Sequence, residues 1–188
     1  MGDMVKRLFS GDFHFGHKMV AGLRGFDNTD DHDAWIINNY NAVVNPSDIV
    51  YIVGDLSMGN WDWTLEVCSE LKGNKRLIAG NHDACWVQHR NWRKYIRPTL
   101  ALFESVSMWE QTKINGVRVN ISHLPYADHN REDDSRYMDV RLTGPTPLIH
   151  GHTHGQEKAH GNMFHVGWDA HHKPVSESEI VRSWDAVN

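Results

Sequence analysis

The sequence predicts an α/β fold, in which β-strands alternate with α-helices along the chain. Short apolar runs rich in β-branched residues are separated by longer segments with the spacing of amphipathic helices. Several of these runs end in polar loops that contain glycine, where an expected strand gives way to a turn. The chain has 188 residues, which suffices for a sizeable core, and we expect a single domain over residues 1–188.

The first half of the chain shows the clearest alternation. Residues 49–53 are continuously apolar and β-branched, as expected of a strand that is covered on both faces. A helix follows possible N-caps at Asp30 and Asp31 and ends at Val44, because the Asn45-Pro46 pair stops it. The other elements expected in this half are strands at residues 5–9 and 76–79 and a helix at residues 61–71 that Asn60 caps.

The second half is expected to contain a helix, a hairpin and further short strands. A helix at residues 84–97 must stop before Pro98. Alternating apolar residues on either side of Asn115-Gly116 predict a hairpin of residues 106–110 with 117–121, because Asn-Gly suits a type I′ turn. A polar surface loop at residues 127–146 precedes strands at 146–149 and 163–166 and a last helix, which the Ser176–Glu179 capping box opens.

Composition and charge exclude several classes of protein. Hydrophobic residues make up 40% of the chain, and a mean hydropathy of -0.56 leaves no room for a bundle of membrane helices. Because the formal net charge is -5, bulk charge does not attract a long nucleic acid, and any polyanion must be held locally. Cys68 and Cys85 are too few for a disulfide framework, and the first residues lack the apolar run of a signal peptide. We therefore expect a cytoplasmic protein with reduced thiols.

Histidine is the unusual residue of this sequence. The chain has 14 histidines, and histidine is both the commonest metal ligand and an acid or base near neutral pH. In open α/β sheets, ligands bind beyond the carboxyl ends of strands, so residues that follow different strands can converge on one site. Five strand-like runs end in such residues: Asp12 and His14, Asp55, Asn81 and His82, His123, and His152 and His154.

The types and spacing of these residues favour a metal site. Asp12 and His14 are two residues apart, as are His152 and His154, and side chains two apart in an extended segment leave the same face. A mixture of imidazole, carboxylate and amide oxygen without thiolate suits Zn, Fe, Mn, Co or Ni. It does not suit a structural zinc site built from cysteines.

The motifs, taken in order, resemble those of the calcineurin-like metallophosphoesterases. They are D-x-H at residues 12–14, G-D at 54–55, G-N-H-D at 80–83, His123, and G-H-x-H at 151–154. The S-G-D-F-H-F-G-H segment and the small size look most like the compact phage and bacterial phosphodiesterases of that superfamily, which places a phage-encoded chain in the host cytoplasm. The resemblance implies two stacked mixed β-sheets flanked by helices, with metals at one end and no cap domain.

The resemblance also implies a centre of two divalent metal ions. Two cations about 3.5–4 Å apart need a shared anion, and Asp55 is expected to bridge them. Manganese is the favoured metal, and Fe, Zn, Co and Ni are the other choices. In this arrangement Asp12, His14 and His154 hold one ion, and Asn81, His123 and His152 hold the other.

The implied activity is hydrolysis of phosphoesters by a hydroxide that the two metals activate. Small phosphodiesters, cyclic nucleotides among them, are the expected substrates, because no long insertion remains for a cap. His82 follows Asn81 directly and is free to act as general acid toward the leaving group. Asp83 is then expected to orient the His82 ring.

His17 and Arg24 are further candidates for contact with the substrate. His17 lies three residues after His14 and is close enough in sequence to face a phosphate, although a solvated or core-capping histidine is the commoner finding. Arg24 is able to clamp a phosphate with two hydrogen bonds, but it also fits an ordinary surface arginine. A basic helix face comprises Arg90, Arg93, Lys94 and Arg97. Because cations near a helix C-terminus are favoured by the helix dipole, we interpret this face as a solvated surface in preference to a binding platform for phosphate.

Two other functions stay open at this stage. A nuclease acting on DNA or RNA would use the basic helix face, and its affinity for oligonucleotides would fall with salt. A non-catalytic scaffold of the same fold would instead bind a partner protein. The presence of His82 and of a complete set of ligand types argues against the scaffold.

Overall fold

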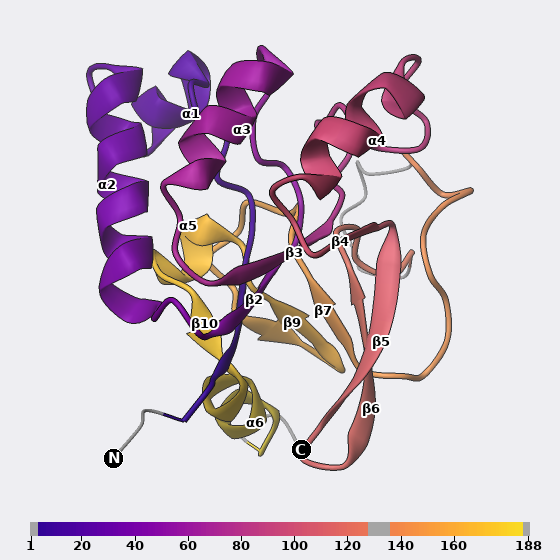
Figure 1. Cartoon of the computed structure of the whole chain (residues 1–188). Coiled ribbons are helices and arrows are strands. Elements are labelled where there is room, and N and C mark those ends of the chain that lie inside the picture. The colour runs from indigo at the N-terminus through magenta and orange to yellow at the C-terminus, as the bar shows by residue number, and fades with distance from the viewer. Residues whose placement is uncertain (1–3, 128–135, 186–188) are drawn as a thin grey trace.

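Two five-stranded β-sheets stack on each other in the computed structural model, which describes residues 4–127 and 136–185 (Figure 1). In the first sheet four strands are parallel and the fifth joins antiparallel, and the second sheet is also mixed. The predicted stacked mixed sheets are therefore confirmed. The strand orders are β10 (Val175–Ser176), β1 (Arg7–Ser10), β2 (Ile49–Ile52), β3 (Asn74–Ile78), β4 (Ser105–Ser107), and β5 (Trp109–Ile114), β6 (Val117–Ser122), β7 (Leu148–His150), β9 (Met163–His165), β8 (Ala159–His160).

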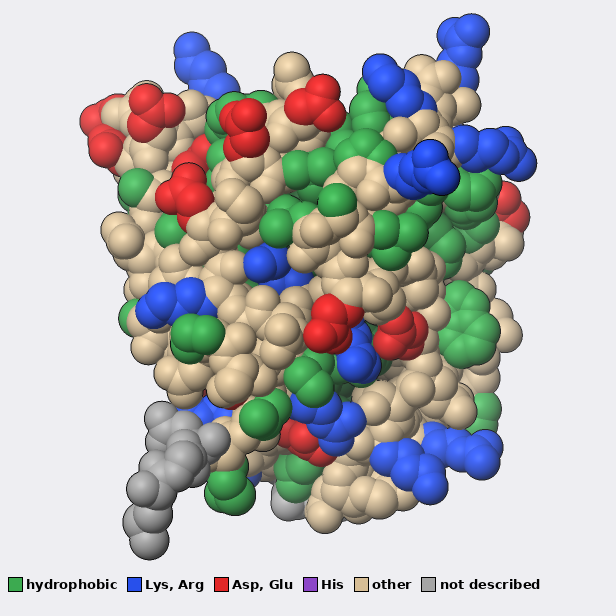
Figure 2. Space-filling model, viewed as in Figure 1, with side chains coloured by type: hydrophobic (Ala, Val, Ile, Leu, Met, Phe, Trp, Pro, Cys, Tyr) green, Lys and Arg blue, Asp and Glu red, His purple; other side chains and the backbone are tan. Residues whose placement is uncertain are grey.

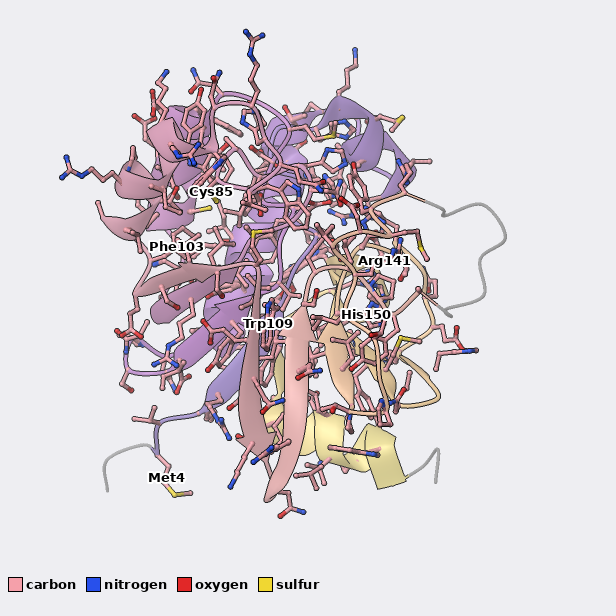
Figure 3. All side chains as sticks on the ribbon, turned by 90° about the vertical axis from the view of Figure 1, so that its right-hand side faces the viewer. Met4, Cys85, Phe103, Trp109, Arg141 and His150 are labelled. Atoms are coloured by element: carbon pink, nitrogen blue, oxygen red, sulfur yellow. The ribbon has the colours of Figure 1, made fainter. Side chains whose placement is uncertain are left out.

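Helices flank the sheets, and the alternation of apolar side chains decides which face they cover. In β1, Leu8 packs in a cluster with Tyr40 and Cys68 of two helices, whereas the next residue, Phe9, packs with Ile149 of the second sheet. Figure 3 shows Phe103, part of the first cluster, on the side of the helix at Trp92–Leu100. The helices are α1 (Lys18–Leu23), α2 (Thr29–Val43), α3 (Trp61–Ser69), α4 (Trp92–Leu100), α5 (Trp168–His171) and α6 (Glu177–Asp185).

Parallel pairing brings the ends of β1, β2 and β3 to the same edge of the first sheet. Ser10 of β1 lies opposite Ile52 of β2, which lies opposite Leu77 of β3. Past the strands the backbone pairing continues, with Asp12 N donating to Gly54 O at 2.9 Å. Residues that follow these strands in sequence therefore become neighbours in space.

The helix expected at residues 84–97 is shorter and later than predicted. Residues 84–91 form turns, and α4 begins at Trp92 and continues through Pro98. The proline ring removes one N–H, but Thr99 Oγ1 donates to Tyr95 O at 2.7 Å and Ala101 N to Arg97 O at 3.2 Å, so helical bonding carries on past it. Arg90 consequently lies before the helix, outside the basic face predicted for it.

The hairpin around Asn115-Gly116 is confirmed, but its first strand lies later than predicted. Asn115 and Gly116 have φ angles of 47° and 81°, as a type I′ turn requires. The turn joins β5 to β6, whereas the earlier part of the expected strand forms β4 in the first sheet. A single apolar stretch is therefore divided between two sheets.

The capping box is also confirmed, because Ser176 N donates to Glu179 Oε2 at 2.8 Å and Glu179 N to Ser176 Oγ at 3.3 Å.

Asp83 ties the loops after β2 and β3 together. Its carboxylate is fully buried and accepts hydrogen bonds from Asp55 N at 3.1 Å, Leu56 N at 2.8 Å and Gly80 N at 2.7 Å. Three buried backbone donors in two loops thus share one acceptor group. The positions of the loops depend on this side chain.

Ile149→Ala is expected to lower the free energy of unfolding by about 2–5 kcal/mol, because it leaves a cavity between the sheets. Ile149 is fully buried and lies opposite Ile121 and Phe164 in neighbouring strands. Urea denaturation measures the loss. Val117→Ala, which truncates an exposed residue of β6, serves as the control and should cost less than about 0.5 kcal/mol. Equal losses in the two variants would contradict this packing.

Asp83→Ala should lower the free energy of unfolding of the metal-free protein by about 3 kcal/mol or more. Three buried N–H groups lose their acceptor, and each such loss costs about 1–3 kcal/mol. Urea denaturation in the presence of a chelator separates this effect from metal binding. The control is Glu66→Ala, which removes an exposed carboxylate from α3. A loss no larger than that of the control would show that the loops do not need Asp83.

Candidate metal centre

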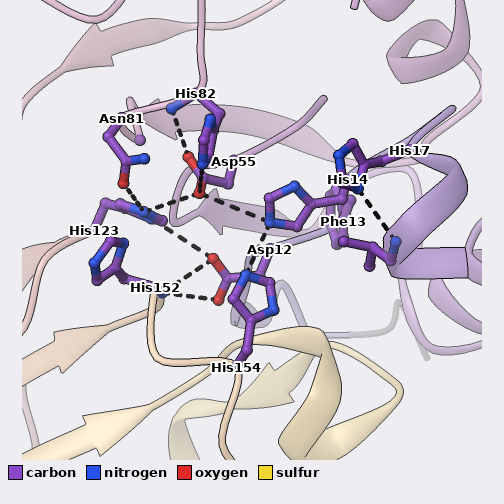
Figure 4. Close-up of polar contacts among 12 residues, drawn as sticks. Asp12, Phe13, His14, His17, Asp55, Asn81, His82, His123, His152 and His154 are labelled. Carbon is purple, nitrogen blue, oxygen red and sulfur yellow. Dashed lines mark hydrogen bonds and ion pairs between the residues drawn. The ribbon is translucent and has the colours of Figure 1, made fainter. Parts of the chain in front are cut away.

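Loops that follow strands of both sheets bring their side chains together at one site (Figure 4). The strand-end residues that the sequence singled out lie together there, although they are spread over more than 140 positions of the chain. They form two groups of donors, each containing residues from both sheets. The first sheet contributes Asp12, His14, Asp55 and Asn81, and the second contributes His123, His152 and His154.

The first group of donors comprises Asp12, His14 and His154, whose ligand atoms all lie within 4.8 Å of one another. The Nε2 atoms of His14 and His154 are 3.0 Å apart, so both rings point at the same place. Burial lowers the pKa of His14 to about 3, which keeps this ring neutral. Neutral imidazole is the form that binds a metal, so this group fits a cation.

The second group comprises Asp55, His123 and His152, again with ligand atoms within 4.8 Å of one another. Asn81 adds an amide oxygen, because its Oδ1 lies 3.1 Å from His123 Nε2. Carboxylate, imidazole and amide oxygen atoms thus face a common point. This group also fits a divalent cation.

Asp55 lies between the two groups. Its Oδ2 atom is 3.7 Å from His14 Nε2 of the first group and 3.3 Å from His123 Nε2 of the second. A methyl group at Gly80 would come within 2.3 Å of Asp55 Oδ1, so the carboxylate needs a glycine beside it. A carboxylate in contact with donors of both groups is able to serve two cations at once.

His123 has one ring nitrogen fixed by the protein and the other directed at the donors. Its Nδ1 lies 2.9 Å from Val53 O, and because a carbonyl only accepts, Nδ1 carries the hydrogen. Burial opposes a charge on the ring, but Asp55 and Asp12 outweigh it and raise the pKa of His123 to about 10. Without a metal, Nε2 therefore holds a proton at neutral pH, which a cation has to displace.

The backbone is strained at the donors. Left-handed φ angles are uncommon for residues other than glycine, and they collect at functional sites. Tyr137, whose ring lies beside the donors, also has a positive φ angle of 60°. Among the donor residues, left-handed φ angles between 50° and 72° occur at Asp12, His14, Asp55, His152 and His154.

His82 lies at the edge of the donors and is open to solvent. Its Nε2 is 4.0 Å from Asp55 Oδ2, and its side chain is 34% exposed. The backbone N–H of His82 donates to Asp55 Oδ1 at 2.9 Å, which holds the residue beside the bridge position. The ring centroid lies 5.7 Å from that of His14. This places an imidazole beside the two groups without making it one of their donors.

Two of the predicted partners have other tasks. Asp83, which was expected to orient His82, directs its carboxylate to the backbone N–H groups of two loops. His17 caps α1, because its Nδ1 accepts a hydrogen bond from Val20 N at 3.2 Å. The His17 ring is half-buried and its centroid lies 5.8 Å from that of His14, near the site but engaged with the helix.

Arg24 has a different task from the phosphate clamp expected of it. The Arg24 side chain is 5% exposed, and its guanidinium makes a bidentate ion pair with Asp169, with two N–O distances of 2.8 Å. It also donates to Phe13 O at 2.9 Å and Asp12 O at 2.7 Å, and lies 3.0 Å from His32 Nε2. All five guanidinium N–H groups are thereby used within the protein, which leaves none for a substrate.

Three residues near the donors were not foreseen from the sequence. Asp169 Oδ2 lies 2.8 Å from His154 Nδ1. His165 is buried, with Nε2 3.7 Å from Asp12 Oδ2, and its place at the end of a strand is a signal that could have identified it. The Tyr137 ring lies 6.2 Å from that of His152, and its position in a polar loop offers no such signal; residues 128–135 of that loop lie outside the described residues.

The basic surface on α4 is smaller than predicted. Figure 2 shows Lys and Arg side chains gathered over α4 at the upper right of this view. Arg93 and Lys94 are exposed and lie over the rings of Trp92 and Tyr95, at 4.8 Å and 5.0 Å from the ring centroids. Arg97 completes the helix face, without Arg90.

Some of the known proteins that are similar in sequence match nearly the whole chain, and another matches less than half of it. No family model matches. The Gene 66 protein of Mycobacterium phage L5 is 34% identical over 201 aligned positions, which cover 98% of this chain and 95% of that protein. An uncharacterized protein of Methanocaldococcus jannaschii is 36% identical over 84 residues, or 43% of this chain.

In the part of the chain that the structure describes, no helix is long and apolar enough to cross a membrane.

A solved structure shares the fold. The protein of unknown function AQ665 from Aquifex aeolicus superposes with a TM-score of 0.71 at 23% identity, covering 96% of this chain and 100% of that one. The Gene 66 protein of Mycobacterium phage D29 is 31% identical over 185 aligned positions, which cover 92% of both chains. Because both phage proteins match over nearly their whole length at more than 30% identity, the chain belongs to the family of the mycobacteriophage Gene 66 proteins.

Proposed function

We propose that the protein is a metal-dependent phosphodiesterase that hydrolyses small phosphodiesters, such as cyclic nucleotides, with two divalent metal ions. The observation that carries this proposal is the pair of neighbouring donor groups, with Asp55 Oδ2 close to a histidine of each. Paired groups of this kind suit two-metal hydrolysis of phosphoesters. The order of the motifs along the chain, which resembles the metallophosphoesterases, agrees with it.

In this proposal the donor residues are divided between two ions. Asp55 would serve both ions, and manganese is the metal we favour, because the set contains carboxylate and amide oxygen atoms, which suit it. When bound, two such ions lower the pKa of a water molecule toward ~7 and neutralise the charge of the phosphoryl group. One ion would be held by Asp12, His14 and His154, and the other by Asn81, His123 and His152.

His82 supplies the proton for the leaving group. Its ring lies at the edge of the donors, is not needed to complete either group, and is partly open to solvent, from which a proton can be replaced. The backbone bond from His82 N to Asp55 Oδ1 keeps the residue at a constant distance from the bridging carboxylate. A general acid placed in this way typically contributes about 10²–10⁴-fold to the rate.

The preference for diesters rests on the charge that the site has to hold. A monoester carries a second negative charge, which calls for further cationic side chains. Arg24, the basic residue expected to provide one, is fully engaged with Asp169 and with carbonyl groups. The substrate phosphate is then held chiefly by the metal ions, which suits a singly charged diester.

A nuclease is the second candidate. The observation that favours it is the exposed basic and aromatic surface of α4, with Arg93 over Trp92 and Lys94 over Tyr95. Its oligonucleotide affinity would fall as salt rises. The net charge of -5 for the whole chain opposes it, so we place small diesters first.

A panel of substrates tests the proposed activity. With Mn²⁺ present, kcat/KM should be highest for a phosphodiester or cyclic nucleotide and lower for every phosphomonoester, and a chelator should abolish turnover. Asp55→Ala, which removes the shared carboxylate, should lose bound metal and activity together. Higher kcat/KM for monoesters would overturn the diester preference. Turnover that survives the chelator, or two tightly bound ions in Asp55→Ala, would overturn the two-metal assignment.

His82→Ala should keep both metal ions and lose turnover of an alkyl diester by ~10²–10⁴-fold. An ester with an acidic leaving group needs little protonation, so the variant should hydrolyse it far better relative to wild type. Rates on the two esters, together with metal content, measure the effect. His17→Ala, which truncates a neighbouring histidine, is the control and should slow the two esters by the same factor. Equal slowing in His82→Ala, or loss of metal from it, would exclude the role of general acid.

A further inference from the structure

We propose that Asp169, held in place by Arg24, is a positioning residue that sets the affinity of one of the two metal ions. This inference rests on the proposed metal centre. It concerns the ion bound by Asp12, His14 and His154 and leaves the other ion unaffected. We call Asp169, Arg24 and His32 the Asp169 clamp.

Packing alone does not hold His154. Its side chain is 38% exposed, whereas those of His14 and His123 are 3% and 0% exposed. A ring that is open to solvent is able to rotate away from a metal site. Holding it in one orientation therefore costs conformational entropy. Another contact must therefore fix the His154 ring.

The contact is with Asp169. Its Oδ2 lies 2.8 Å from His154 Nδ1, and since a carboxylate accepts, Nδ1 must donate. The ring is then held in the tautomer that leaves Nε2 free, and Nε2 is the atom that lies 3.0 Å from His14 Nε2. Carboxylates that hold metal-binding histidines in this way raise metal affinity, and their removal typically costs about 10–100-fold.

Arg24 fixes Asp169 and links it to the loop after β1. The guanidinium grips both oxygens of Asp169, so the carboxylate has one orientation. The same guanidinium donates to the carbonyl groups of Asp12 and Phe13, immediately before His14. The Arg24 guanidinium thus connects Asp169, the partner of His154, to the backbone that carries the donors Asp12 and His14.

Asp33 extends the clamp through His32, on the far side of Arg24. His32 Nε2 faces an Arg24 N–H at 3.0 Å and therefore accepts, which places the hydrogen on Nδ1, 2.7 Å from Asp33 Oδ1. Asp33 Oδ2 accepts from Gly16 N at 2.8 Å, two residues after His14. Hydrogen bonds therefore hold the segment with Asp12 and His14 at Asp12 O, through Arg24, and at Gly16 N, through Asp33.

The second group of donors is oriented by other means. His123 is fully buried, and its Nδ1 is bound to the carbonyl of Val53. Asn81 follows β3, and the hydrogen bonds described for the clamp do not reach the loop after that strand. A substitution in the clamp should for this reason act on one ion.

Titration of the metal-free, full-length protein with Mn²⁺ by calorimetry tests the proposal. Wild type should bind two ions. In Asp169→Ala, one ion should bind about 10–100-fold more weakly, while the affinity for the other stays within the error of wild type. Asp169→Asn, which keeps an oxygen for His154 but loses the charge, should fall in between. Arg24→Lys, which keeps the charge but loses the two-pronged grip, should also weaken one ion, and it replaces Asp169→Ala if that variant does not fold.

The control breaks an ion pair of the same geometry away from the site. Arg7, at the start of β1, grips Glu177 with N–O distances of 2.9 Å and 2.6 Å. Glu177→Ala removes this pair and should leave both affinities unchanged. If Asp169→Ala weakened metal binding only through a general loss of rigidity, Glu177→Ala would weaken it as well.

A double-mutant cycle with His154→Ala separates positioning from a structural effect. If Asp169 acts through His154, Asp169→Ala should have no further effect on metal affinity once His154 is absent. Additive losses, equal weakening of both ions, or two ions bound as in wild type would overturn the clamp. A wild-type protein that binds no divalent ion would instead overturn the metal centre, and the two failures are therefore distinguishable.

Discussion

The burial of two carboxylates side by side is the constraint on which this end of the molecule depends. Asp12 is 0% exposed and Asp55 is 1% exposed, and a buried charge is costly unless it is compensated. Burial alone would raise the pKa of each, but hydrogen bonds and neighbouring imidazoles hold both pKa values well below their usual range. The backbone N–H of His152 contributes by donating to both oxygens of Asp12 at 3.0 Å. Cations at this place would complete the compensation.

Compensation on this scale requires the backbone to come very close to the carboxylates. Glycines make this possible, because a methyl group on Gly151 would lie 2.7 Å from Asp12 Oδ2 and one on Gly167 would lie 2.3 Å from the same atom. The donors in these loops also adopt left-handed φ angles. The glycines at these positions therefore provide space for ligand atoms, which differs from the phosphate-cradling use of glycine-rich loops.

The sequence predicts the donors better than the residues that support them. Asp12, Asp55 and His123 follow apolar strands, so strand recognition and the rule that strand ends converge bring them together. Asp169 and Arg24 are 145 residues apart, and no periodicity links them. Their pairing is a tertiary contact, which local sequence does not encode.

The same reason explains the errors in secondary structure. Pro98 lies inside α4 because helical bonds on either side of it outweigh the loss of one N–H. The apolar alternation that predicted one hairpin strand crosses the point where the chain leaves one sheet for the other, between β4 and β5. Alternation reports which face of a strand is buried, but it does not report the sheet to which the strand belongs.

Each donor group takes residues from both sheets, and this has a consequence for cohesion of the sandwich. An ion bound to Asp12, His14 and His154 would connect the loop after β1 to the loop after β7, and so would act as a cross-link between the two layers. Its binding free energy adds to folding, by an amount that rises with the logarithm of the free ion concentration. Thermal tolerance of this protein would then follow the metal supply of the cell in which it is made, in addition to the apolar contacts between its sheets.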